Sequence, residues 1–147
     1  MNVNNKILDE IPQSAQTHLN MLQAIIQRMS TNSASCKTWC ITLVSGLVVV
    51  LFTNSNNKLF PVIIVPVLLF FFLDAYYLAL EKRFRMSHDL FIEKIHNGQL
   101  VTSDLFVIRP SGKMASTLGK SILSLSVWPF YVTLFLLNLG FYIYLIK

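Results

Sequence analysis

The sequence predicts an all-α integral membrane protein with three transmembrane helices and a small cytosolic helical layer. Charged residues make up 13% of the 147 residues and hydrophobic residues make up 54%. Soluble domains carry about 25% charged residues, so a soluble chain of this composition would have too little charge to cover its surface. The apolar residues also gather in three runs with polar segments between them, which is typical of helices that cross a bilayer.

The first apolar run covers residues 39–52 and is shorter than the roughly 20 residues that a spanning helix needs. Thr38, Thr53 and the uncharged residues 54–57 can extend it, because hydroxyl groups can bond back to helix carbonyls. We therefore expect the first span at about 37–56, where a thinner bilayer or neighbouring helices compensate for the short apolar length.

The second run, residues 59–80, has the right length for a span and ends at the charged cluster that begins with Glu81. Pro61 fits the first turn of a helix, whereas Pro66 is expected to bend the helix or to free a carbonyl.

The third run covers residues 122–146, and its continuous apolar section is 127–146. Aromatic residues that favour membrane interfaces lie near both ends of this section: Trp128, Tyr131, Tyr142 and Tyr144.

The orientation follows from the lysines and arginines. Residues 1–38 hold three of them, including Lys6, and residues 81–121 hold seven, whereas the first loop has only Lys58 and the C-terminal end only Lys147. The positive-inside rule places the N-terminus and residues 81–121 in the cytosol and the C-terminus in the periplasm of a bacterial inner membrane. The predicted parts are a cytosolic amphipathic helix (1–36), transmembrane helices one and two (37–80), a cytosolic helical extension and loop (81–121), and transmembrane helix three (122–147).

Residues 12–31 repeat apolar side chains at helical spacing, and the opposite face carries mostly uncharged glutamines. A helix that lies on a membrane usually has lysine or arginine on that face, so we expect this one to pack on another cytosolic helix or subunit. Its expected partner is residues 81–97, which continue the helix of span two and end at Asn97-Gly98.

Asp74 is an ionisable residue inside the second span, and such residues are functional candidates. It lies about 12 Å along the helix from Lys82, near the inner headgroup boundary. We interpret it as one half of an intramembrane polar pair, with a cation or hydroxyl group on an adjacent helix; a proton or ion relay is the alternative.

A stripe of small residues on span one indicates close helix packing, within the chain or between subunits, or the lining of a pore. Its members are Thr38, Thr42, Ser45, Gly46 and Val49. Asn138, near the middle of span three, is expected to bond to another helix or to line the same pore.

Four basic residues could contact an anionic ligand or lipid headgroups: Arg83, Arg85, Arg109 and Lys113.

Cys36 and Cys40 lie on one helix face and are interpreted as reduced packing residues. The three histidines, His18, His88 and His96, are interpreted as isolated, so no metal site is expected. The chain has no phosphate loop, catalytic triad, paired carboxylates or nucleic-acid motif, and we expect neither an enzyme nor a cofactor nor nucleic-acid binding.

The stretches from His18 to Leu47 and from Phe70 to Arg85 resemble an uncharacterised family of small bacterial inner-membrane proteins. The layout is also similar to membrane effectors of bacterial anti-phage (antiviral) defence systems. That resemblance implies a few spans joined to a cytosolic sensing part, which damages the membrane when it is triggered.

The resulting expectation is a homo-oligomer in the lipid bilayer that acts as a cytosolically gated pore or membrane-perturbing effector, triggered by a cytosolic protein or a small molecule. The alternative is a non-catalytic membrane anchor or subunit that docks a soluble partner protein. A transporter is disfavoured, because no ionisable residue lies at mid-membrane.

Overall fold

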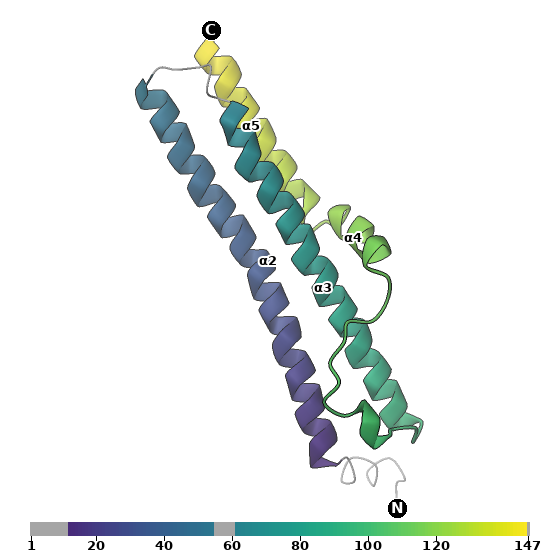
Figure 1. The fold of residues 1–147 in the computed structure, drawn as a ribbon. Helices are drawn as coiled ribbons and strands as arrows, with labels where there is room; N and C mark the ends of the chain where they lie inside the picture. Colours follow the sequence, from purple (N-terminus) through teal and green to yellow (C-terminus); the bar gives the residue numbers. More distant parts are fainter. Residues whose placement is uncertain (1–11, 55–60, 147) are drawn as a thin grey trace, which may run out of the picture.

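The computed structural model describes residues 12–54 and 61–146. All regular structure in this part of the chain is helical, as predicted: α2 (Gln13–Asn54), α3 (Ile64–His96), the 3-10 turn η2 (Thr102–Asp104), α4 (Met114–Ile122) and α5 (Trp128–Ile146) (Figure 1). Three of the lysines whose charges support the predicted orientation lie outside the described residues: Lys6, Lys58 and Lys147. The first eleven residues of the predicted cytosolic part also lie outside them.

α2 is one helix of 42 residues. The amphipathic segment 12–31 and the first predicted span therefore form a single rod, because neither glycine nor proline occurs between Gln13 and Ser45. α2 runs antiparallel to α3, and the two helices lie side by side along most of their length (Figure 1).

α3 confirms that the helix of span two continues through residues 81–96. It ends at His96. Gly98, two residues further on, has a φ of 64°, which glycine readily adopts, and its N–H bonds to the Ile95 carbonyl at 3.1 Å. The bend expected at Pro66 is wrong. Pro66 is the third residue of α3, where a backbone N–H has no partner within the helix, so a proline costs little.

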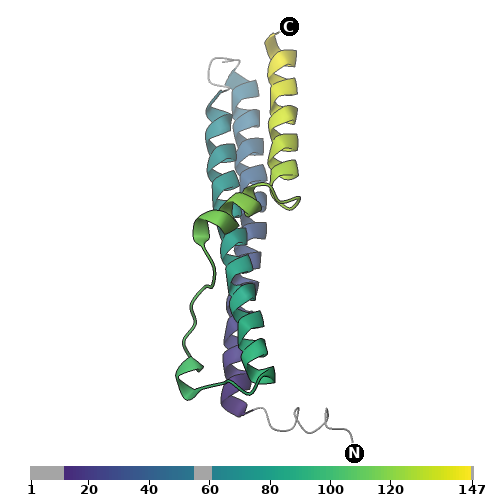
Figure 2. The ribbon, with the colours of Figure 1, turned by 90° about the vertical axis from the view of Figure 1, so that its right-hand side faces the viewer.

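Residues 99–113, which we call the strap, run back along α3 to α4, and α4 crosses the outside of α3 before the chain enters α5 (Figure 2). Leu123 and Leu125, in the corner between α4 and α5, are 77% and 82% exposed. α5 then lies beside the first half of α3, so that three helices form one end of the molecule and two helices with the strap form the other.

The three-helix end is called the apolar half: α2 from residue 37, α3 up to residue 80, and α5. The other end, residues 13–36, 81–96 and the strap, is called the stalk. Each has its own small core. The core of the apolar half is Cys40, Val44, Leu51, Ile63, Val67, Ala75, Val127 and Tyr131; that of the stalk is Ala15, Leu22 and Phe91 with partly buried neighbours.

Among the described residues, two helices are long and apolar enough to cross a membrane, those within Gln13–Leu51 and Pro61–His96. The third predicted span corresponds to α5, whose apolar stretch Trp128–Ile143 is shorter.

Candidate functional site

A buried ion pair joins α2 to α3 at the junction of the stalk and the apolar half. Asp74 on α3 is 0% exposed. Its Oδ2 lies 2.6 Å from Nζ of Lys37, and its Oδ1 accepts a hydrogen bond from the Ser33 hydroxyl. Ser33 and Lys37 are four residues apart on α2, so both side chains face the same carboxylate. The structure thus gives Asp74 both kinds of partner that the sequence indicated, a cation and a hydroxyl group on an adjacent helix.

α5 also contributes to the surroundings of this pair. Tyr131 of α5 is buried, donates its hydroxyl to the Phe70 carbonyl at 3.1 Å, and lies close enough to Asp74 to interact with its charge. Cys36 and Cys40 are buried and free, in agreement with the expected packing role. In the sequence, Lys37 contributes to the charge count that predicts the orientation. Its position as the last cation before the apolar run also indicates that it could reach Asp74.

The small-residue stripe points away from the rest of the chain. Thr38, Thr42, Ser45 and Gly46 are exposed, and nothing outside the local helix lies within 4 Å of the position that a Cβ would take at Gly46. The Thr42 hydroxyl bonds to the Thr38 carbonyl on its own helix at 2.9 Å. Packing of the stripe within the chain is therefore wrong for the described residues, and contact between subunits stays a prediction.

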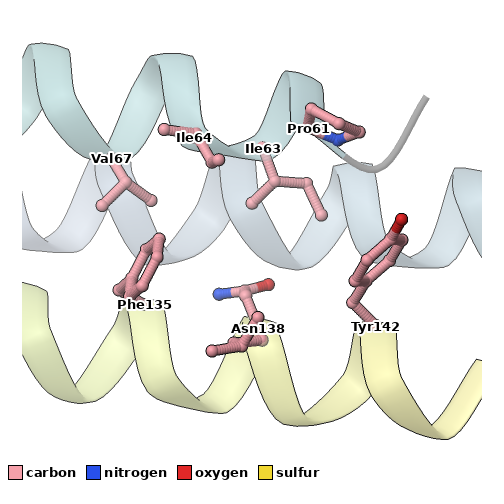
Figure 3. A pocket seen from close by; sticks show the side chains of 8 residues that line it. Pro61, Ile63, Ile64, Val67, Phe135, Asn138 and Tyr142 are labelled. Atoms are coloured by element: carbon pink, nitrogen blue, oxygen red, sulfur yellow. The ribbon is translucent and has the colours of Figure 1, made fainter. Parts of the chain in front are cut away.

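Asn138 is buried between α5 and the start of α3. It lines an apolar cavity of about 160 Å³ and lies opposite Ile63 and Val67 (Figure 3). Its Nδ2 donates to the Leu134 carbonyl at 2.7 Å, one turn earlier on the same helix. The expected bond to another helix is therefore wrong for this amide nitrogen, because the nearer carbonyl of α5 is available to it.

The four basic residues do not form one anion-binding surface. Arg83 holds the strap, donating to the carbonyls of Pro110 and Ser111 at 3.1 Å each. Arg85 bonds to Glu81 on its own helix at 2.8 Å. Arg109 and Lys113 are exposed on the strap. Arg83 and Arg85, two residues apart, project from different sides of α3. Contact of these four residues with an anionic ligand or with lipid headgroups stays a prediction.

His18, which is interpreted from the sequence as isolated, connects α2 to the strap. Its Nδ1 accepts the Phe106 backbone N–H at 2.9 Å, and its ring packs on Phe91 with 4.2 Å between centroids. Burial lowers the pKa of His18 below its ordinary value of 6.5, and the nearby Asp104 carboxylate partly offsets this effect. The hydrogen bond from Lys94 (2.7 Å) is the main cause that lowers the pKa of Asp104.

A cavity of about 190 Å³ lies beside His18, between the stalk helices and the strap, and Lys94, Asp104 and Arg109 also line it. No group of three or more histidine, cysteine, aspartate or glutamate residues is arranged to hold a metal ion in the described ranges.

No protein family, curated protein or solved structure matches the chain.

Proposed function

We propose that the chain is a three-span protein of a bacterial inner membrane that assembles with copies of itself into a cytosolically gated pore or membrane-perturbing effector. The outer surface of the apolar half supports the membrane location. Large apolar side chains are exposed on all three of its helices, with Val65 65% and Leu69 62% exposed on α3. An apolar surface of this kind is unfavourable in water and favourable in hydrocarbon.

Three spans and their orientation rest on α5 and on charge. α5 has 19 residues, which extend about 28 Å, close to the roughly 30 Å of a bilayer's hydrocarbon core. Positive charges on the stalk, strap and α4, including Arg83, Arg109 and Lys120, favour a cytosolic stalk and a periplasmic C-terminus.

The observation that carries the proposed gating is the continuity of α2 and α3 from the stalk into the apolar half. Both helices pass through the Lys37–Asp74 contact without a break. A displacement of one helix in the stalk therefore moves the same helix among the spans, since a helix is a rigid element over this length.

The uncovered stripe supports self-association. Thr38, Thr42, Ser45 and Gly46 let a second copy approach closely, which is how small residues act at interfaces between spanning helices. The hydroxyl groups of Thr38, Thr42 and Ser45 would also provide a polar lining if the assembly opened around them.

Dye leakage from liposomes that contain the purified protein tests this proposal. We expect leakage from the wild type when acid or a candidate ligand is added, and we expect Thr42→Leu and Gly46→Leu to abolish it by adding bulk to the stripe. Leu43→Phe adds bulk to an exposed position of α2 outside the stripe and is expected to leave leakage unchanged. A wild-type protein that inserts and never leaks or conducts, with or without acid or candidate ligands, would remove the pore.

One observation favours the alternative, a membrane anchor that docks a soluble protein. A groove of about 460 Å³ on the stalk is lined by polar side chains of both helices, including Gln23, Gln27, Arg85 and Asp89. A partner recovered in stoichiometric amount from cells and lost on Arg85→Glu would support this function in place of the pore.

A further inference from the structure

The hydrogen bond between His18 and the strap requires one protonation state. Nδ1 of His18 accepts the Phe106 N–H, so Nδ1 carries no proton and the neutral ring has its proton on Nε2. The side chain is only 2% exposed and packs on Phe91, which keeps the ring in the orientation that presents Nδ1 to the strap.

The strap is held to α3 and α2 by different chemistry. On α3, Lys94 pairs with Asp104, Ser87 donates to the Arg109 carbonyl at 2.7 Å, and Arg83 donates to Pro110 and Ser111. None of these α3 contacts depends on the protonation of a histidine. On α2, the strap is joined to a histidine, the side-chain type whose ordinary pKa of 6.5 lies nearest to neutral pH.

The strap backbone is strained where His18 binds it. Phe106 has a φ of 62°, in the left-handed region that residues with a Cβ seldom adopt. That conformation is unfavourable for a residue with a Cβ, so the strap would leave it once the contact that fixes the Phe106 N–H is lost.

We propose that His18 is a pH-sensitive latch, whose protonation releases the strap from α2 while the α3 contacts remain. A proton added to Nδ1 turns the acceptor into a donor that faces another donor, the Phe106 N–H, and the bond cannot form. The adjacent cavity gives the ring a space into which water can enter and solvate the imidazolium.

The charges around His18 set the direction of the pH dependence. Asp104 of the strap favours the protonated ring, Lys94 of α3 and Arg109 of the strap disfavour it, and burial disfavours it most. Because the pKa in the folded protein lies below 6.5, the latch is fully closed above that pH and opens as the pH falls through the lower folded value. Acidification is thus the signal to which this contact responds.

Hydrogen exchange of the full chain in nanodiscs tests the latch. The readout is protection of the Phe106 amide in a peptide spanning 101–108, measured from pH 8 to pH 5 and normalised to intrinsic exchange rates. We expect protection in the wild type to fall by up to about tenfold per pH unit as the pH drops below 6.5, the ordinary pKa of histidine, and to level off below the lower pKa of folded His18.

His18→Asn is the decisive variant, because the asparagine carboxamide oxygen can accept near the position of Nδ1 and does not titrate. We expect it to keep the protection at every pH. His88→Asn and His96→Asn change the other two histidines and are expected to keep the wild-type pH dependence. Protection of the apolar-half peptides verifies that each variant is folded, and His18→Gln provides a second non-titrating acceptor if His18→Asn fails this test.

Protection in the wild type that does not change with pH would overturn the latch, and so would a pH dependence that survives in both folded His18 variants. This readout does not depend on the proposed pore. Acid-induced leakage without a change at Phe106 would leave the pore standing and remove the latch. A pH-dependent change at Phe106 in a protein that leaks under no trigger would support the latch and remove the pore.

Discussion

The stalk and the apolar half are built largely from the same two helices, yet their side chains are arranged in opposite ways. In the stalk, Leu22 and Phe91 are buried and glutamines face outward. In the apolar half, Val65 and Leu69 face outward, whereas Asp74 and Lys37 meet between the helices. A helix needs no break to pass between two solvents, since its backbone bonds are satisfied internally in both. Only its side-chain pattern has to change, and here it changes at the Lys37–Asp74 contact.

The largest effect is expected from breaking that contact on one side. Lys37→Met leaves the fully buried Asp74 carboxylate without its cation. We expect the free energy of unfolding to fall by about 3–5 kcal/mol, the usual result when one partner of a buried pair is removed. Unfolding of the purified protein in mixed micelles measures the change.

The double variant Lys37→Met/Asp74→Leu sharpens this result, because it removes both charges. We expect it to recover most of the lost stability. Equal stability of Lys37→Met and the wild type would mean that Asp74 is not held by Lys37.

A matched pair of leucines on α3 tests whether the two halves face different solvents. Leu69 of the apolar half is 62% exposed and Leu90 of the stalk is 49% exposed. We expect Leu69→Lys to impair membrane insertion by about 3–4 kcal/mol, and Leu90→Lys to change the inserted fraction little. Membrane fractionation after expression gives the inserted fraction, and equal tolerance of both lysines would contradict the assignment of solvents.

A smaller effect is expected where the strap meets the stalk. Arg83→Gln removes the donors to the Pro110 and Ser111 carbonyls. We expect a loss of about 1–3 kcal/mol, the cost of leaving partly buried acceptors without a partner. Faster hydrogen exchange in residues 108–114 should accompany it, whereas Arg85→Gln, which loses only its bond to Glu81, should leave this segment protected.

Local patterns predicted much of the fold. The apolar runs located the second part of α2, the first part of α3, and α5, whereas α4 (Met114–Ile122) was not predicted because it lies outside these runs. The Asn97-Gly98 pair located the end of α3 because a glycine there readily adopts the left-handed backbone conformation. Asp74 could be recognised as a residue in need of a partner, since an ionisable group among apolar residues rarely stays alone.

The partners themselves could not be predicted. The contact between His18 and Phe106 joins residues 88 positions apart and depends on how the strap is laid over the stalk. The outward direction of the small-residue stripe depends on which face of α2 meets α3, and the stripe alone fits a contact within the chain as well as one between copies. Arg83 and Arg85 look alike in the sequence, and only their angular positions on α3 separate a residue that holds the strap from one that pairs with Glu81.

The corner between α4 and α5 has a consequence for the depth at which the protein would sit in a bilayer. If Leu123 and Leu125 enter the edge of a bilayer, they anchor the corner there and so set how deeply the protein is inserted. For a helix perpendicular to the bilayer, the tip of α3 at His96 would then stand roughly 22–24 Å above the lipid surface, counting 1.5 Å per residue from Glu81. A partner that binds the tip of α3 would have to contact it at this height above the lipid surface.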